Sequence, residues 1–363
     1  MKTELFFRTR VRTVERVWVP VRICAIFFFC VFAHGAFAQS DAGAKLNPWF
    51  SQLDLSFASG GAYADIKEFE YHKNSAGEYV LFSRLDWKNI VMWTVGTKLG
   101  CDISRWRLAF DFSTALPVPG PSSMQDRDWT TLGSALTDYS EHKARLDSFF
   151  NTEASLAYRF FDTEILILGA GAGFAYTATN LTAYDGSTSL PSQKKYSGNV
   201  ASYSQQIYEP RIMLYGEWKP FSLFETHARL YASPVTFIRA TDTHYKIAPS
   251  GVSQAPKFET QYSDRPFGPA SCKAELALRF NLPQKKSAGE TEARTEGEKQ
   301  ARSAPPVRHA FALQAHAVFV PEIKGASYRR TLSTSAPFAK TGNKAGSSYF
   351  SFGISLAYCM RIR

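Results

Sequence analysis

The chain has 363 residues, of which 45% are hydrophobic and 20% charged, and its formal net charge is +10. This composition is typical of a folded protein and not of a disordered one. The positive charge is mild, and no basic helix or aromatic–basic platform accompanies it, so the sequence excludes nucleic acid as a partner.

The first 38 residues have the pattern of a secretory signal peptide. Six basic residues precede an apolar run at 23–32, and Ala36-Phe37-Ala38 fits the small residues before a cleavage site. The alternative is a single membrane anchor, but a spanning helix needs about 20 apolar residues. We therefore expect 1–38 to be removed and 39–363 to form the mature chain.

Runs of alternating apolar and polar residues then follow along the chain. In 272–280 every second residue is apolar, whereas Lys273 and Glu275 point the other way. A period of two with one apolar face predicts a β-strand. The expected strands lie near residues 47–70, 79–100, 104–116, 148–161, 163–184, 201–220, 222–242, 266–282, 309–323 and 347–361.

These ten runs predict an all-β fold, a ten-stranded antiparallel transmembrane β-barrel with long extracellular loops. An even strand number, a signal peptide and aromatic residues at strand ends are typical of barrels in the cell outer membrane. The alternative is a secreted β-sandwich, whose core would not hold the charges found on the polar faces. A porin is disfavoured because open channels usually have about 16 strands or more.

The segments between the strands alternate in length. Short turns are expected near 102–105, 161–163 and 220–222, and long polar loops at 117–147, 185–200, 243–265 and 324–346. Barrels of this type keep short turns on the periplasmic side, which predicts that the long loops are extracellular. Residues 283–308 contain almost no apolar side chains. We expect them to form a flexible periplasmic insertion, with an interdomain linker as the alternative.

Two acidic clusters fall in the expected extracellular loops. Asp126 and Asp128 are two residues apart, as are Asp242 and His244, so each pair shares one face of an extended chain. Two close carboxylates resist joint ionisation, and an imidazole beside a carboxylate can take a proton from water. Each pair alone is an ordinary polar turn, but together they predict a site that activates water for attack on a carbonyl group.

Cysteine and histidine spacing indicates no cofactor. Cys101, Cys272 and Cys359 are odd in number and far apart, so they define no disulfide framework. No Cys-x-x-Cys or His-Glu-x-x-His occurs. We therefore expect neither a metal nor an organic cofactor.

Five short motifs resemble those of the omptins, a family of outer-membrane barrel proteases. They occur in the family's order in residues 50–245, and they are Lys67-Glu68-Phe69-Glu70-Tyr71, Ser83-Arg84-Leu85-Asp86-Trp87-Lys88, Asp126-Arg127-Asp128-Trp129, Thr137-Asp138-Tyr139-Ser140-Glu141-His142 and Asp242-Thr243-His244-Tyr245. The resemblance implies a monomeric endopeptidase that acts on polypeptides, with its active site on the extracellular side of the outer membrane.

The resemblance also implies roles for individual residues. Asp126 and Asp128 would face Asp242 and His244 across a groove, with water as the attacking group. Asp138, Ser140 and His142 would line the groove, since nothing near Ser140 in the sequence is an obvious base for it. Glu68 matches the first of two acids that hold a basic side chain beside the cleaved bond.

The chain departs from the family at two places. The second acid of the specificity pocket falls on Ala240, so selectivity for basic residues should weaken or shift. The lipopolysaccharide-binding run falls on 174–178, which carries no charge, so lipopolysaccharide dependence is not implied. These departures favour the alternative function, a non-enzymatic barrel acting as an adhesin or surface-binding protein. Retention of all four catalytic residue types favours the endopeptidase.

Overall fold

The computed structural model describes residues 51–130, 135–245, 259–268, 271–283, 307–332 and 336–362. The expected signal peptide and nearly all of the expected insertion at 283–308 lie outside the described residues. No helix within the described ranges is long and apolar enough to cross a membrane.

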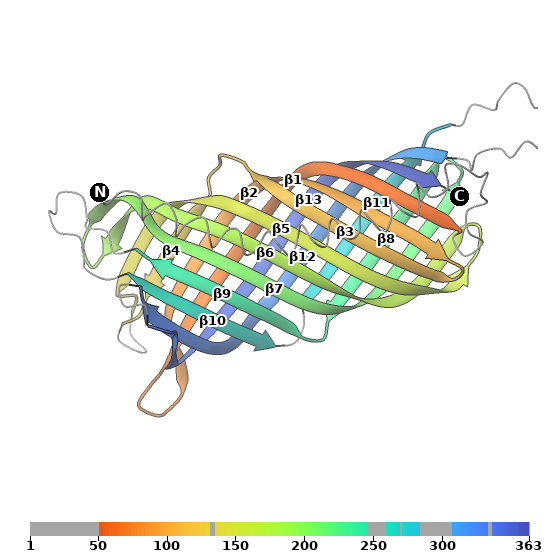
Figure 1. Cartoon of the computed structure of the whole chain (residues 1–363). Helices are drawn as coiled ribbons and strands as arrows, with labels where there is room; N and C mark the ends of the chain where they lie inside the picture. The colour runs from red at the N-terminus through yellow and green to blue at the C-terminus, as the bar shows by residue number, and fades with distance from the viewer. Residues whose placement is uncertain are drawn as a thin grey trace, which may run out of the picture. The chain divides into compact units, whose positions relative to one another are not determined.

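The described residues form thirteen antiparallel strands of one sheet (Figure 1). In chain order they are β1 (Gln52–Lys73), β2 (Tyr79–Ile103), β3 (Trp106–Pro117), β4 (Ser123–Asp128), β5 (Asp138–Asp162), β6 (Leu166–Leu190), β7 (Lys194–Phe221), β8 (Phe224–Ser233), β9 (Thr236–His244), β10 (Thr260–Gly268), β11 (Ser271–Asn281), β12 (Val307–Thr331) and β13 (Ala339–Ile362).

The sheet closes on itself into a ring of ten strands. At one end the ring consists of β1, β2, β4, β5, β6, β7, β9, β10, β12 and β13, closed by the pairing of β10 with β12. At the other end β3, β8 and β11 take the places of β4, β9 and β10, and β8 pairs with β7 and β11. The predicted ten-stranded antiparallel barrel is therefore confirmed. We call the first end the groove end and the second, where β2–β3, β5–β6 and β7–β8 connect, the turn end.

Proline explains why two of the ten strands are interrupted. Pro119 and Pro121 lie between β3 and β4, and Pro234 lies between β8 and β9. Proline has no backbone N–H to donate to a neighbouring strand, so it ends regular pairing. After each of these two interruptions the second half of the strand, β4 or β9, continues at the groove end.

The strands also run further than the sequence pattern predicts. Much of the ranges expected as long loops is strand, and only 191–193 separate β6 from β7. Beyond an apolar belt, both faces of a strand meet water or polar groups, so the alternation that reveals a strand in the sequence fades. The sequence pattern therefore located the strand cores and missed their extensions.

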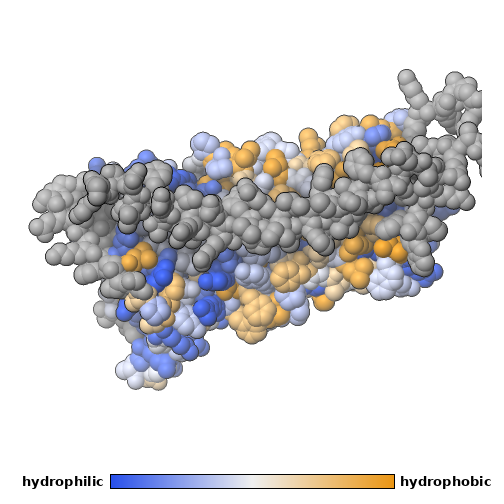
Figure 2. Space-filling view, viewed as in Figure 1, coloured by the Kyte–Doolittle hydropathy of each residue, from blue (hydrophilic) through white to orange (hydrophobic). Residues whose placement is uncertain are grey.

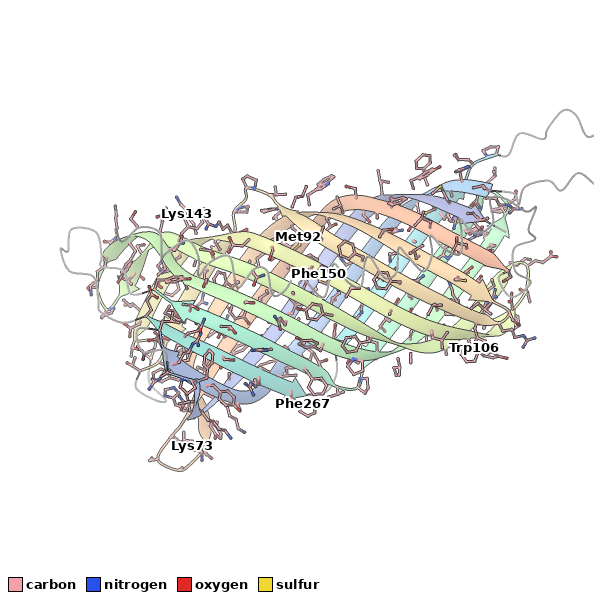
Figure 3. The ribbon with its side chains drawn as sticks, viewed as in Figure 1. Lys73, Met92, Trp106, Lys143, Phe150 and Phe267 are labelled. Carbon is pink, nitrogen blue, oxygen red and sulfur yellow. The ribbon has the colours of Figure 1, made fainter. Side chains whose placement is uncertain are left out.

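The outer surface carries a belt of apolar side chains edged by aromatic rings. Phe112, Phe150, Tyr176 and Tyr208 follow one another across neighbouring strands, with ring centroids 5.2, 5.9 and 5.0 Å apart. Trp106, labelled in Figure 3 near the turn end, packs against Tyr158 at 5.1 Å. Hydrophobic residues gather over the right-hand part of the visible surface in Figure 2, and hydrophilic ones gather at the groove end. Such a belt is typical of transmembrane barrels.

Apolar side chains fill the middle of the barrel. Trp87 is fully buried and stacks on Tyr203, with ring centroids 5.7 Å apart. Ile66, Leu85 and Met124 belong to the same buried cluster. We call this cluster the apolar plug. Small barrels are filled by their inward side chains, and here the plug separates a polar groove end from a charged turn end.

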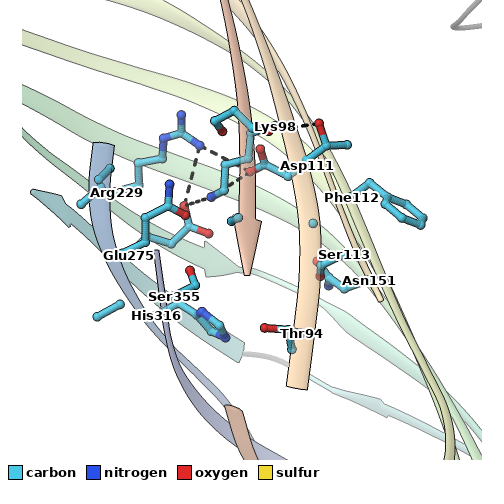
Figure 4. Close-up of a pocket in the computed structure, with 18 of the residues that line it drawn as sticks. Thr94, Lys98, Asp111, Phe112, Ser113, Asn151, Arg229, Glu275, His316 and Ser355 are labelled. Carbon is cyan, nitrogen blue, oxygen red and sulfur yellow. Dashed lines mark hydrogen bonds and ion pairs between the residues drawn. The ribbon is translucent and has the colours of Figure 1, made fainter. Parts of the chain in front are cut away.

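The inward side chains below the plug form a network of ion pairs, which we call the charged lumen. Around a cavity of about 210 Å³, Lys98 lies 3.5 Å from Asp111 and 3.3 Å from Glu275, and Arg229 lies 3.5 Å from Asp111 (Figure 4). Buried charges are tolerated when they are paired and hydrogen-bonded. The lumen also includes Asp54, Asp102, Arg107, Glu153, Arg211, Glu217, Glu225, Lys273, Arg279 and Arg361.

Candidate active site

A second cavity of about 210 Å³ opens at the groove end, above the apolar plug. Six strands contribute to it, and its lining contains six carboxyl groups and one imidazole, with no lysine or arginine. We call it the acidic groove. Its lining residues are Glu68, Glu70, Phe82, Ser83, Leu85, Asp126, Asp128, Asp242, His244, Tyr262, Asp264 and Ser327.

Asp242 and His244 form a hydrogen-bonded pair at the end of β9. Alternation along the strand points both side chains inward, and His244 Nε2 donates to Asp242 Oδ2. The other Asp242 oxygen is buried and has no hydrogen-bond partner among the described residues. Because Nε2 carries the proton, Nδ1 is the basic nitrogen of the neutral ring. Tyr262 packs edge-on against this ring at 5.8 Å.

The surrounding carboxylates keep His244 protonated at neutral pH. Burial alone lowers the pKa of His244, but the charge of Asp242, its hydrogen bond to the ring and the charges of Asp126 and Asp128 outweigh burial and raise the pKa to about 9. Between about pH 7 and pH 9, His244 and Asp126 together hold one proton, which lies on His244 in the major form and on the Asp126–Asp128 pair in the minor form.

Asp126 and Asp128 are held by β4, which lies between β2 and β5. In the register of these strands Asp126 lies opposite Leu85 and Ser140, and Asp128 lies opposite Ser83 and Asp138. Burial, followed by the charge of Asp128, raises the pKa of Asp126 to about 7 despite the opposing effect of His244. Burial also raises the pKa of Asp128, although a hydrogen bond from Ser83 opposes this. One carboxyl of the pair can therefore hold a proton near neutral pH.

The barrel brings these two pairs together from distant strands. In the ring at the groove end, β5, β6 and β7 separate β4 from β9 on one side, and five strands separate them on the other. Asp126, Asp128, Asp242 and His244 nevertheless line the same cavity and influence one another's pKa values. They therefore face one another across the interior of the barrel.

Glu68 lies at the base of the groove beside a residue that the sequence analysis did not single out. Glu68 is 6% exposed on β1, and Asp264 is 5% exposed on β10. The two carboxyl groups hydrogen-bond to each other, and Asp264 also accepts a hydrogen bond from Ser327. Burial and then the charge of Asp242 raise the pKa of Glu68 well above its usual value. Burial raises the pKa of Asp264 to about 7.

No sequence signal distinguished Asp264 beforehand. It falls in 243–265, a range expected to be loop, and an acid in a polar loop is usually solvated. Only the pairing of β10 with β9 and β12 shows that Tyr262, Asp264 and Pro266 face inward.

Asp138, Ser140 and His142 lie beside the groove and are not among the residues that line its cavity. Asp138 and Ser140 are the cross-strand neighbours of Asp128 and Asp126. His142 Nδ1 donates to the backbone carbonyl of Asp185 at 2.6 Å, so Nε2 accepts the Ser140 hydroxyl at 2.9 Å. Ser140 thus has a base partner in His142, which the sequence analysis did not recognise.

Nothing among the described residues indicates a metal centre. No group of three or more His, Cys, Asp or Glu side chains within the described ranges has an arrangement that would hold a metal ion.

Comparison with known proteins bears on the family and the fold. A sequence model described as the Omptin family matches residues 50–286. No curated protein sequence matches the chain. The crystal structure of the outer membrane protease OmpT from Escherichia coli superposes with a TM-score of 0.64 at 17% identity, covering 88% of this chain and 100% of that one. This similarity shows a shared fold.

Other solved barrels are much less similar. The toluene transporter TodX of Pseudomonas putida gives a TM-score of 0.30 at 10% identity, covering 85% of this chain and 89% of that one. The translocator domain of the autotransporter NalP from Neisseria meningitidis gives 0.27 at 6% identity, covering 94% of this chain and 98% of that one.

Proposed function

Because the chain belongs to the omptin family, we propose that it is an outer-membrane endopeptidase that hydrolyses peptide bonds beside basic residues. One observation carries the proposal: Asp126, Asp128, Asp242 and His244 come from opposite sides of the barrel to line one acidic groove. Hairpins of the groove end would face the outside of the cell, because short turns of such barrels face the periplasm.

Water held between the two pairs is the attacking group in the mechanism that we propose. In the form of the site in which the Asp126–Asp128 pair holds the shared proton, the ring of His244 is neutral; Asp242 fixes it through Nε2, which leaves Nδ1 to take a proton from water. The water oxygen then bonds to the peptide carbonyl carbon. His244 returns the proton to the leaving nitrogen as the carbon–nitrogen bond breaks.

The Asp126–Asp128 pair acts on the same water and on the developing charge. Its ionised carboxylate accepts a hydrogen bond from water and orients it. Its protonated carboxyl donates to the carbonyl oxygen, which becomes negative in the transition state. The pKa of Asp126, raised to about 7, supports a shared proton in this pair.

The acidic lining supports a preference for basic residues. Glu68 is buried and its Oε2 has no hydrogen-bond partner among the described residues. A carboxylate in that position pairs well with a substrate arginine or lysine. Polypeptides with such residues are therefore the expected substrates.

The test is cleavage of arginine- and lysine-containing peptides by the refolded barrel, with and without lipopolysaccharide. We expect His244→Ala to reduce kcat/KM by about 10²- to 10⁴-fold, the range for a positioned general base. The proposal fails if wild type and His244→Ala cleave equally, or if neither cleaves. Cleavage of peptide added to intact cells tests whether the groove faces outward.

Ser140→Ala is the matched control for the attacking group. Ser140 has a base in His142, but it does not line the acidic groove. We expect this variant to retain cleavage. Loss of activity as large as that of His244→Ala would favour a serine nucleophile instead of water.

A further inference from the structure

Asp264 lies where side chains from two neighbouring strands, β9 and β10, can reach the same part of the groove. Ala240 on β9 and Asp264 on β10 are directly paired across the two strands, and both are buried and face inward. Side chains at paired positions have Cβ atoms about 4.5–5.5 Å apart. A carboxylate on either strand therefore reaches nearly the same part of the groove.

Glu68 and Asp264 have acceptor capacity that the protein does not use. Asp264 is held by Ser327 and Glu68, yet its Oδ1 is buried without a partner among the described residues, as is Glu68 Oε2. Leaving a buried polar atom unpaired is costly, so a donor that reaches these two oxygens is stabilised there. The groove lining provides no lysine or arginine to act as that donor.

The geometry points to a cation with several donors as the occupant. Two carboxyl groups on different strands, each with a free oxygen, suit a planar guanidinium, whose donors can bond two acceptors at once. A lysine ammonium is a compact charge and satisfies the two positions less well. Building on the proposed endopeptidase function, we propose that Asp264 and Glu68 together form a two-acid pocket that selects arginine over lysine beside the cleaved bond.

This proposal reverses one expectation from the sequence. Ala240 suggested that selectivity for basic residues should weaken. In the structure the missing charge is provided from the paired strand, so selectivity is retained and depends on Asp264.

The test compares peptides that differ at one residue, either arginine, lysine or citrulline, the neutral analogue of arginine. For wild type we expect kcat/KM to fall in that order. Asp264→Ala and Asp264→Asn should reduce the arginine-to-citrulline ratio by roughly 10- to 100-fold, as expected for loss of a hydrogen bond to a charged group. Glu141→Ala removes an exposed acid of the groove end and should leave the ratio unchanged.

Moving the carboxyl group from position 264 to position 240 tests whether Asp264 binds substrate or only stabilises the fold. We expect Ala240→Asp to restore most of the arginine preference to the Asp264→Ala variant, because the two positions face each other. An unchanged ratio in Asp264→Ala, or equal losses for arginine and citrulline peptides, would overturn the proposal.

Binding to the inactive His244→Ala barrel tests the pocket apart from catalysis. A fluorescent arginine peptide should bind more tightly than its citrulline analogue, and Asp264→Ala should remove the difference. If wild type cleaves no peptide but the His244→Ala barrel still binds the arginine peptide more tightly than the citrulline peptide, the proposed endopeptidase function is wrong and the proposed two-acid pocket is supported. Equal binding of the two peptides overturns the pocket itself.

Discussion

The acidic groove and the charged lumen are two polar regions of one barrel, separated by the apolar plug. In the lumen, Arg107 lies 2.8 Å from Asp54 and 3.0 Å from Glu217, so each buried charge is matched. In the groove, the acids have no lysine or arginine among the lining residues. The lumen contains several lysine and arginine side chains among its acids, whereas His244 is the single cation among six carboxyl groups in the groove lining.

This difference separates a structural role from a functional one. Matched charges fill a barrel interior at little net cost. Unmatched carboxylates repel one another and hold protons near neutral pH, as the raised pKa values of Asp126 and Asp264 indicate. Buried groups with perturbed pKa values gather at functional sites, which supports the proposed binding of a cationic side chain and proton transfer in the groove.

The largest expected effect is on catalysis, from Asp242→Asn. It removes the carboxylate that orients His244, and kcat/KM should fall by about 10²- to 10⁴-fold. In wild type we expect a maximum between pKa values of about 7 and about 9, where Asp126 and His244 together hold one proton. Loss of the Asp242 charge lowers the pKa of His244 and moves the alkaline limb to lower pH. An unmoved limb in a full pH–rate profile would contradict this assignment.

Removing a cation from the lumen should cost stability instead of activity. Arg107→Ala removes one cationic partner each from Asp54 and Glu217, which keep Arg361 and Lys219, and should cost about 1.5–3 kcal/mol of unfolding free energy, the range for a hydrogen bond to a charged group. Arg239→Ala, on the exposed outer face of β9, is the control and should cost no more than about 0.5 kcal/mol. Denaturant titration in micelles measures both. Equal losses would show that the lumen pairs are not structural.

Adding a cation to the groove should make it resemble the lumen. In Ala240→Lys the new ammonium lies opposite Asp264 and competes with the substrate. We expect kcat/KM for an arginine peptide to fall by roughly 10- to 100-fold, the effect of losing one charged hydrogen bond. Ala240→Met has similar length without charge. If both variants lose arginine preference equally, bulk and not charge is responsible.

The smallest expected effect is that of salt. Raising the ionic strength from about 0.01 to about 1 M shortens the Debye length from about 30 to about 3 Å. Cleavage of an arginine peptide should slow several-fold, whereas cleavage of a citrulline peptide and the unfolding free energy should change little. A parallel fall for both peptides would indicate a general salt effect.

Alternation along the chain was enough to predict the barrel, because its membrane belt forces every second residue to be apolar. The motifs at Asp126 and Asp242 predicted for a similar reason that each pair of side chains lies together in the groove, since residues two apart share a face of any strand. Asp264 could not be found in this way. Its segment lies beyond the apolar belt, where both faces of a strand are polar and a buried acid looks like a solvated one.

The sequence by itself determined the all-β class, the number of strands and the residue types needed for proton transfer. These depend on spacing within a few residues, which covalent geometry fixes. The tertiary structure alone decided which charges meet. Closure of the ring placed Asp126 across from His244, and the register of β9 with β10 placed Asp264 beside Glu68 and opposite Ala240. The first two of these contacts join residues more than a hundred positions apart, and the register of the paired strands, not local spacing, specifies all three.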